Sequence, residues 1–402
     1  MSFEELVATE HAYHMNVYGR QPVAFVRGEG VRLWDTEGRE YLDFLSGIAV
    51  VSVGHSHPKV VEAVRDQIGR LTHVSNLYYT EPQVLLAQRL HDLLGWGKVF
   101  FANSGAEANE CALKLARRWG RRDGAERTGV VAVLGSFHGR TFTTLAATGQ
   151  PAKHAPFAPL PGWFRYVELD DIAALDRAID DGTSAVLLEV IQGEGGVRAS
   201  SPEFIGAARR LCNERAAALV FDEVQTGLGR TGRWFGFQHY DVLPDIVTLA
   251  KALGAGLPIG ACVAREEVAD AFKPGDHATT FGGGPVVCAA ALAVLEVIEQ
   301  EDLVQNAERM GTHLVEGLQK ATASDPGVTE VRGTGLLCAV QLDGDRAADV
   351  VTAARDRGLI VNNVTPSAIR LAPPLTVTEV EIERAVALLA DALAAVRERP
   401  GG

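Results

Sequence analysis

Continuous apolar runs predict the strands of this chain. From about residue 98 onward, the clearest runs span residues 99–101, 130–134, 185–190 and 219–221. Their hydrophobicity is continuous rather than alternating, which indicates strands that are covered on both faces. Helical stretches separate the runs, so the pattern predicts an α/β domain around a mostly parallel sheet. Ligand-binding residues are then expected just after the carboxyl ends of the strands.

The pattern changes after residues 282–285, which read Gly-Gly-Gly-Pro. Residues 286–322 are strongly helical, and a final helix is expected at about 379–398, with Thr378 as its N-cap and Glu381 three residues later. Short strands and one further helix lie between them, which predicts a separate, smaller α/β domain. The predicted organisation is an N-terminal arm and small-domain segment over 1–45, a large domain over 46–285 and a C-terminal small domain over 286–402.

Lys251 is the single charged residue in the apolar run of residues 246–264. Burying an unpaired ammonium is very costly, so this lysine must be neutralised, paired or used chemically. The run is long enough to suggest a membrane segment, but Lys251, Pro258 and three glycines indicate a buried strand and loop instead. Upstream, residues 220–225 form a second buried strand that ends in carboxylates, of which Asp222 is the first.

A lysine that can lose its proton and an acid at a strand end are what a pyridoxal phosphate (PLP) enzyme requires. Lys251 would form the Schiff base with the cofactor, and the Asp222 carboxylate would keep the pyridine nitrogen protonated. The alternatives are structural. Lys251 would then form a buried salt bridge, and Asp222 would cap a helix or pair with a cation.

Three further turns carry candidate binding residues. Residues 103–109 follow a strand and open a helix, whose free N–H groups and Ser104 hydroxyl would cup a phosphate. In the next loop, Phe137 could stack on a flat ring and Arg140 could pair with a carboxylate. Glu194 is flanked by glycines and therefore faces whatever occupies the cleft. The structural alternatives are a capped turn, a core phenylalanine, a surface arginine and a solvated glutamate.

Composition excludes several classes of protein. The net charge of −13 argues against nucleic-acid binding. Five scattered cysteines without a CxxC indicate a reduced, cytoplasmic protein with no cysteine zinc site, and the N-terminus has no apolar signal core.

Residues 227–232 match the G-x-G-x-x-G pattern, but the residues that follow lack helical periodicity, so we reject dinucleotide binding. We read His55 and His57 as parts of a polar turn and predict no metal site.

Taken together and in order, these motifs resemble those of the class III PLP-dependent aminotransferases, in particular the members that act on N2-acetylornithine. The likeness spans nearly the whole chain. The segments that carry it are 41–44, 54–58, 73–79, 103–109, 137–141, 192–196, 221–227, 250–251, 280–283 and 369–374.

The resemblance implies the fold of PLP-dependent transferases of type I and an obligate homodimer with a shared active site. It implies that Lys251 carries PLP and moves the proton, and that Asp222 pairs with the ring nitrogen. The other cofactor-binding residues that it implies are Ser104, Gly105 and Ala106 at the phosphate, Phe137 and Val224 on the two ring faces, Gln225 at the phenolic oxygen and Thr280 from the other subunit.

The resemblance also implies the reaction. The terminal amine of N2-acetylornithine would pass to 2-oxoglutarate, with Arg140 holding the distal carboxylate of the donor and Arg370 the carboxylate beside the keto carbon of the acceptor. Glu194 would neutralise Arg370 while the donor is bound, and Thr279 would lie near the substrate. Donors such as ornithine, succinylornithine, succinyldiaminopimelate and 4-aminobutyrate remain alternatives, because the cofactor residues would be the same.

Three positions depart from the pattern common in the family. Ala106 stands where threonine is often found, so one phosphate hydroxyl is missing. Gly284 and Val51 stand where asparagine is common. A neutral hydrogen bond contributes about 0.5–1.5 kcal/mol, so PLP binding should survive the alanine. Two other classes of protein agree less well with the sequence. A non-catalytic PLP-fold protein would not need both Lys251 and Asp222, and a dinucleotide-dependent oxidoreductase would rest on the 227–232 glycines alone.

Overall fold

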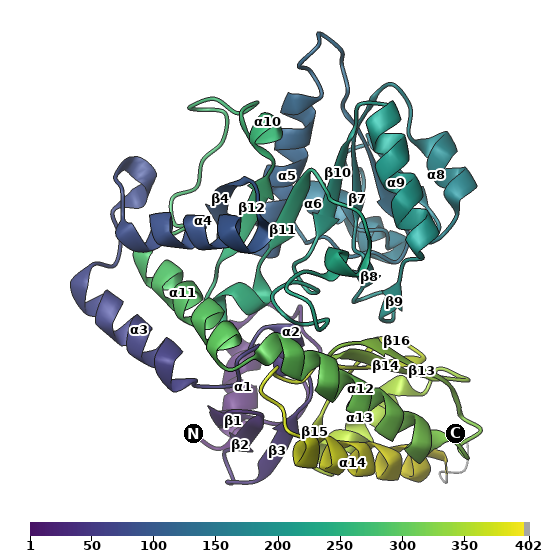
Figure 1. The fold of residues 1–402 in the computed structure, drawn as a ribbon. Coiled ribbons are helices and arrows are strands. Elements are labelled where there is room, and N and C mark those ends of the chain that lie inside the picture. Colours follow the sequence, from purple (N-terminus) through teal and green to yellow (C-terminus); the bar gives the residue numbers. More distant parts are fainter. Residues whose placement is uncertain (398–402) are drawn as a thin grey trace.

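A seven-stranded sheet forms the centre of the computed structural model, which describes residues 1–397 (Figure 1). Its strand order is β4-β12-β11-β10-β7-β5-β6, and only β12 runs against its neighbours. The prediction of a mostly parallel sheet is confirmed. The strands are β4 (Lys98–Ala102), β5 (Gly129–Val133), β6 (Phe164–Val167), β7 (Thr183–Leu188), β10 (Ala218–Asp222), β11 (Ile246–Leu249) and β12 (Gly260–Ala264).

Helices cover both faces of this sheet, which explains the continuous apolar runs. In β10, Val220 packs in the hydrophobic cluster that contains residues of α5 (Gly105–Trp119), whereas Phe221 packs in the cluster that contains residues of α9 (Pro202–Glu214). Successive side chains of a strand point to opposite faces, so every residue of a central strand is buried. Covered faces of this kind are typical of parallel sheets.

The C-terminal part builds a smaller α/β unit, as predicted. Its sheet is antiparallel in the order β13-β14-β17-β16. Thr378 and Glu381 bond to each other's backbone N–H groups, which confirms the predicted start of the last helix. The elements are α11 (Pro285–Gln300), α12 (Leu303–Thr322), β13 (Val328–Thr334), β14 (Leu337–Leu342), α13 (Ala347–Asp356), β15 (Leu359–Ile360), β16 (Asn362–Thr365), β17 (Ala368–Leu371) and α14 (Glu379–Arg397).

The N-terminal segment joins this smaller unit. Its strands β1 (Phe25–Glu29), β2 (Arg32–Asp35) and β3 (Glu40–Asp43) form a sheet that β15 completes by pairing parallel to β3. This pairing supports the proposed division at 1–45, 46–285 and 286–402, in which the first segment belongs with the small domain. Residue 398, the predicted end of the last helix, lies outside the described residues.

The remaining elements surround the two units. None of the helices within residues 1–397 has the length and apolar character that crossing a membrane would require. The remaining elements are the helices α1 (Phe3–Tyr13), α2 (Ser46–Ala49), α3 (Pro58–Arg70), α4 (Glu81–Leu94), α6 (Phe142–Ala147), α7 (Pro151–His154), α8 (Ile172–Ala178) and α10 (Glu266–Ala269), the strands β8 (Ile191–Gln192) and β9 (Arg198–Ala199), and the 3₁₀ turns η1 (Ser75–Leu77), η2 (Ala155–Phe157), η3 (Gly236–His239) and η4 (Lys251–Gly254).

The glycine-rich segment 227–232 is a turn that holds the two units together. The buried Arg230 donates from Nη1 to the carbonyl oxygens of Leu336, at 3.1 Å, and of Pro373. Its own carbonyl oxygen accepts from the Leu336 N–H at 3.0 Å. A Cβ atom on Gly232 would lie 2.9 Å from Cβ of Glu308, so the glycine permits close contact with α12. The turn is not followed by an α-helix, in agreement with our rejection of the dinucleotide pattern.

Candidate active site

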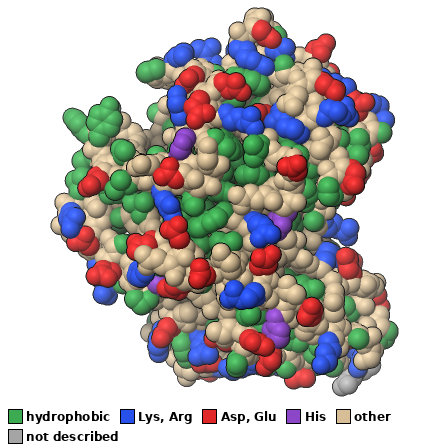
Figure 2. Space-filling view, in the orientation of Figure 1, with side chains coloured by type: hydrophobic (Ala, Val, Ile, Leu, Met, Phe, Trp, Pro, Cys, Tyr) green, Lys and Arg blue, Asp and Glu red, His purple; other side chains and the backbone are tan. Residues whose placement is uncertain are grey.

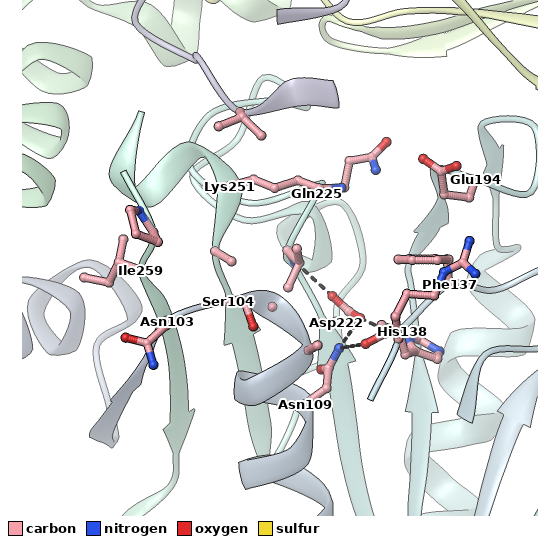
Figure 3. A pocket seen from close by; sticks show the side chains of 18 of the residues that line it. Asn103, Ser104, Asn109, Phe137, His138, Glu194, Asp222, Gln225, Lys251 and Ile259 are labelled. Atoms are coloured by element: carbon pink, nitrogen blue, oxygen red, sulfur yellow. Dashed lines mark hydrogen bonds and ion pairs between the residues drawn. The ribbon is translucent and has the colours of Figure 1, made fainter. Parts of the chain in front are cut away.

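A cavity of about 440 Å³ opens at the carboxyl edge of the central sheet (Figure 3). Its walls are the loops that follow β4, β5, β7, β10 and β11, so parallel strands deliver their C-terminal residues to one place. Its volume is typical of a site for a small ligand. The sequence-predicted residues that line it are Ser104, Gly105, Ala106, Phe137, Arg140, Glu194, Asp222, Val224, Gln225 and Lys251.

The start of α5 supplies one wall. Ser104 is the N-cap, and its Oγ accepts from the Glu107 N–H at 3.2 Å. This 15-residue helix begins at the cavity wall, so its first N–H groups and the positive end of its dipole favour an anion there. A Cβ on Gly105 would lie 2.8 Å from Cγ1 of Val224, so glycine lets the helix start pack against the β10 loop. This wall fits a phosphate group, with Ala106 contributing no hydroxyl.

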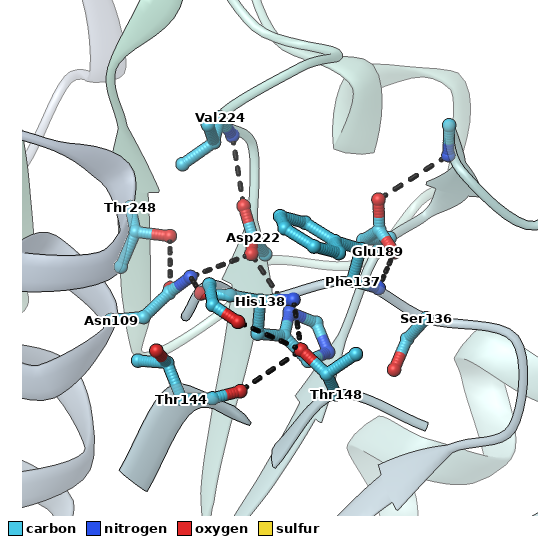
Figure 4. Close-up of polar contacts among 12 residues, drawn as sticks. Asn109, Ser136, Phe137, His138, Thr144, Thr148, Glu189, Asp222, Val224 and Thr248 are labelled. Carbon is cyan, nitrogen blue, oxygen red and sulfur yellow. Dashed lines mark hydrogen bonds and ion pairs between the residues drawn. The ribbon is translucent and has the colours of Figure 1, made fainter. Parts of the chain in front are cut away.

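Asp222 lies at the base of the cavity in a network of polar contacts (Figure 4). Its Oδ1 accepts from the Val224 N–H at 3.0 Å, and its Oδ2 accepts from Nδ2 of Asn109 at 2.7 Å. Oδ2 also lies 2.8 Å from Nδ1 of His138, and Thr248 donates to Oδ1 of Asn109 at 2.7 Å. These contacts fix the orientation of a buried carboxylate. Asn109 and His138 were not assigned roles from the sequence.

Lys251 begins the 3₁₀ turn after β11, and its side chain extends across the cavity toward Gln225 (Figure 3). Burial, together with the nearby charge of Arg370, lowers the pKa of Lys251 to about 8. A substantial fraction of the amine is therefore neutral near physiological pH. The residue also has a φ of 39°, and a left-handed backbone costs about 1–2 kcal/mol for a residue with a Cβ. Strain of this kind is common at functional sites.

Arg370, on β17 of the small unit, reaches the rim of the same site. It is fully buried, and its Nη1 donates to Oε1 of Glu194 at 2.6 Å and to Oε1 of Gln225 at 2.9 Å. Burial tends to raise the pKa of Glu194, but the charge and hydrogen bond of Arg370, with Lys251 and Lys153 nearby, lower it overall. Within residues 1–397, Nη2 of Arg370 has no hydrogen-bond partner, so this nitrogen is available to a second acceptor.

The loop after β5 holds Phe137 and Arg140. The guanidinium carbon of Arg140 lies 5.6 Å from the centroid of the Phe137 ring. Arg140 is exposed at the cavity mouth, and no carboxylate of the described residues lies within 4.0 Å of it. The side chain is thus placed to meet an anion at the entrance, at a position distinct from the buried Arg370.

Glu189 is a residue of the site that the sequence analysis missed. It follows β7, which ends at Leu188 rather than continuing to 190 as predicted. Its carboxylate is 6% exposed and accepts from the N–H groups of Phe137, at 2.8 Å, and Gly193, at 3.3 Å. Burial raises the pKa of Glu189 to about 7, although the charge of His138 acts in the opposite direction. The sequence feature that could have identified Glu189 is its position as an acid at the end of an apolar run.

Besides Arg370, which reaches only the rim, two predicted residues do not line this cavity. Thr280 lines a separate small cleft with residues 73–76 and 282–285. Thr279 lies nearer, because its Oγ1 accepts from Nδ2 of Asn103 at 3.4 Å, and Asn103 is at the cavity wall. Thr280 therefore does not contribute to the cavity of its own subunit.

Comparison with known proteins identifies the family. Residues 14–393 match the model of the class III aminotransferases. The chain belongs to the class III aminotransferases. A relative from this family, the acetylornithine aminotransferase of Caldanaerobacter subterraneus subsp. tengcongensis, is 48% identical, with 98% of this chain and 100% of the relative covered.

Solved structures of class III aminotransferases have the same fold. The ornithine aminotransferase of Toxoplasma gondii superposes with a TM-score of 0.95 at 35% identity and covers 100% of this chain and 97% of its own. The acetylornithine aminotransferase of Elizabethkingia anophelis gives a TM-score of 0.88 at 34% identity, covering 98% and 100%. The predicted fold class, a PLP-dependent transferase of fold type I, is confirmed.

Enzymes of the class III family use PLP, and the cavity fits this cofactor. It offers a lysine amine of lowered pKa, a fixed carboxylate, a helix start for the phosphate and an aromatic ring. The chain is thus a PLP-dependent aminotransferase. We assign Lys251, Asp222 and the helix start at Ser104 to the cofactor as proposals, since they rest on geometry and on the family pattern.

Proposed function

We propose that the enzyme transfers the terminal amine of N2-acetyl-L-ornithine to 2-oxoglutarate. The products would be N-acetyl-L-glutamate 5-semialdehyde and L-glutamate, a step of arginine biosynthesis. The near-complete match to an acetylornithine aminotransferase at 48% identity supports the donor. The observation that carries the chemistry is the contact of Glu194 with Arg370 at the rim of the PLP site.

PLP, when bound, supplies an electron sink that stabilises negative charge at the carbon bearing the transferred amine. The protein residues bind the cofactor and move the protons. Asp222 holds a proton on the ring nitrogen, Lys251 takes and returns the proton at the reacting carbon, and the start of α5 binds the phosphate. The pKa of about 8 suits Lys251 to this role, because a general base works best when its pKa is near the operating pH.

Two arginines at different depths suit two substrates of different charge. The donor reacts at its terminal amine and carries its carboxylate far from the reacting atoms, where the exposed Arg140 would bind it. The acceptor carries a carboxylate beside its keto carbon, which requires the buried Arg370. While the donor is bound, Glu194 pairs with Arg370 and leaves no buried charge uncompensated. It must move away when the acceptor enters.

The substrate assignment is tested by a panel of half-reactions with the PLP-loaded enzyme. We expect acetylornithine to convert the bound cofactor with a kcat/KM at least about tenfold above that of 4-aminobutyrate, because a site built to bind polar substrate groups discriminates strongly against analogues without them. The measurement is the change in the visible absorbance of the enzyme after mixing with each donor. Equal rates for the two donors would refute the proposed substrate.

Ornithine is the second candidate donor. The superposition on the ornithine aminotransferase of Toxoplasma gondii, with a TM-score of 0.95, is the observation that favours it. The same panel decides between the two. A preference for free ornithine over its N2-acetyl derivative would reassign the donor and leave the cofactor chemistry unchanged.

We further propose that the enzyme is a cytoplasmic homodimer with a shared site. The five cysteines are free and buried, as expected in a reducing compartment. Large apolar side chains are exposed on the segment between α3 and α4, which protrudes at the left of Figure 2, and on the neighbouring Phe281. Exposed patches of this kind mark protein interfaces. Across such an interface, Thr280 of the partner subunit would reach the phosphate.

The dimer is tested by replacing one residue of this patch. Phe281→Glu should yield a single chain of 42.9 kDa in sedimentation, with loss of transaminase activity, since charge at the centre of an apolar interface opposes association. Val380→Glu is the matched control, because Val380 is 73% exposed and Phe281 is 67% exposed, and Val380 lies on α14 away from the patch. A wild-type enzyme that sediments at the mass of one chain would disprove the proposal.

A further inference from the structure

Glu189 joins two loops that carry different functions. Its Oε2 accepts from the N–H of Phe137, in the loop after β5, and its Oε1 accepts from the N–H of Gly193, in the loop after β8. The carboxylate is buried and lines the cavity. One side chain therefore fixes the backbone of the ring-stacking residue and the backbone next to Glu194.

The two contacts differ in length. The bond to Phe137 is 2.8 Å long, within the usual range for an N–H···O bond, whereas the bond to Gly193 is 3.3 Å long, beyond that range, and is therefore weaker. The bond to Phe137 is thus the stronger of the two, and the bond to Gly193 is the one that gives way first. The loop of Glu194 is the one that must move during the reaction.

Gly193 also touches the substrate-binding arginine. Its carbonyl oxygen lies 3.3 Å from Nη1 of Arg370, the same nitrogen that binds Glu194. A Cβ atom at this position would lie 2.2 Å from Oε1 of Gln225, so a side chain here would displace the Gln225 amide from its contact with Arg370. The peptide of Gly193 thus lies between Glu189 on one side and Arg370 on the other, directly before Glu194 in the chain.

We propose that Glu189 is a positioning residue that holds the Gly193–Glu194 segment against Arg370 and so sets how readily Glu194 gives way to a dicarboxylate. The inference rests on the proposed exchange of Glu194 for a substrate carboxylate. It assigns the choice between the two half-reactions to a side chain whose hydrogen-bond partners are the backbone N–H groups of Phe137 and Gly193. With the donor bound, both contacts of Glu189 are made. With the acceptor bound, the bond to Gly193 is released and the bond to Phe137 remains.

The test is Glu189→Gln. Its amide oxygen can still accept from Phe137, but its NH₂ group then faces the N–H of Gly193, and two donors repel each other. We expect kcat/KM for acetylornithine to fall about tenfold, because the buried N–H of Gly193 is left without an acceptor, while that for the dicarboxylate half-reaction changes less than about threefold. Backbone hydrogen exchange over residues 193–196 should quicken, and the visible spectrum of bound PLP should persist.

Glu223→Gln is the matched control. Glu223 is also buried, and it likewise accepts from two backbone N–H groups, those of Gly236 at 2.9 Å and Phe237 at 2.7 Å, but it does not line the cavity. This control should lower thermal stability without altering the ratio of the two half-reactions. Equal losses in the two half-reactions of Glu189→Gln, which would leave the ratio of their kcat/KM values unchanged, would overturn the proposal.

A double variant links the effect to Glu194. Glu194→Gln alone should impair the same half-reaction, and adding Glu189→Gln should have little further effect, because both changes release Arg370. Fully additive losses would show that Glu189 acts elsewhere. If Glu189→Gln does not fold, Glu189→Asp, which keeps the charge but shortens the reach, gives the same readouts. A wild-type preference for another donor would refute the substrate assignment alone, since the ratio can be measured with that donor.

Discussion

Lys251→Ala is expected to lower the rate of transamination by at least about 10³-fold, within the range that a positioned acid–base group contributes. The reason is local. Lys251 is a half-buried amine of the cavity whose pKa is lowered to about 8, so it can both accept a proton and return it. The substituted methyl group can do neither. The measurement is the single-turnover rate of each half-reaction with PLP-saturated enzyme.

Lys251→Arg is the control for charge. Arginine keeps the cation but does not deprotonate in proteins, so it should be as inactive as the alanine variant. Both variants should also lose the yellow colour that reports a covalent link between lysine and cofactor. If Lys251→Arg retained most of the activity, the amine would act only as a charge, and its assignment as the proton-transfer residue would be wrong.

Asp222→Asn should lower kcat by about 10²-fold or more, the loss typical when one preorganised electrostatic group is removed from an active site. An amide cannot hold a proton on the ring nitrogen by charge, so the cofactor becomes a poorer electron sink. The substitution also leaves Asn109 and His138 facing a neutral group that no longer accepts at both oxygens. Steady-state kinetics and the visible spectrum of the bound cofactor are the measurements.

Thr248→Val tests the hydrogen-bond network around Asp222 without changing the charge of the aspartate. It removes the hydroxyl that donates to Asn109 at 2.7 Å but leaves the Asp222 carboxylate intact. We expect a loss of about tenfold or less, since one hydrogen bond contributes about 0.5–1.5 kcal/mol. An Asp222→Asn variant that was no slower than Thr248→Val would contradict the role assigned to the aspartate.

The sequence was sufficient for the fold and for part of the site. The central strands were readable because parallel strands buried on both faces give continuous apolar runs. Lys251 and Asp222 were found by the same logic, as polar residues at the ends of such runs. Asp222 ends β10 and Lys251 follows β11, and these neighbouring parallel strands end at the same edge.

Contacts between distant segments could not be derived from the pattern. Glu194 and Arg370 are 176 residues apart and meet only because the small unit packs over the carboxyl edge of the central sheet. The resemblance to the aminotransferases suggested this pair, whereas residue spacing did not. Asn109 and His138 escaped notice for a similar reason, because their shared partner Asp222 is more than 80 residues away from each. A hydrogen-bond network has no signature in a single sequence.

The contact of Arg230 with the small unit has a consequence for the divergence of the family. Its partners across the boundary are the main-chain oxygens of Leu336 and Pro373, and every amino acid carries such an oxygen. Substitutions at those two positions can therefore accumulate without removing the bonds. A lineage could remodel the small unit for a new acceptor while a single arginine side chain keeps the two halves of the enzyme in register.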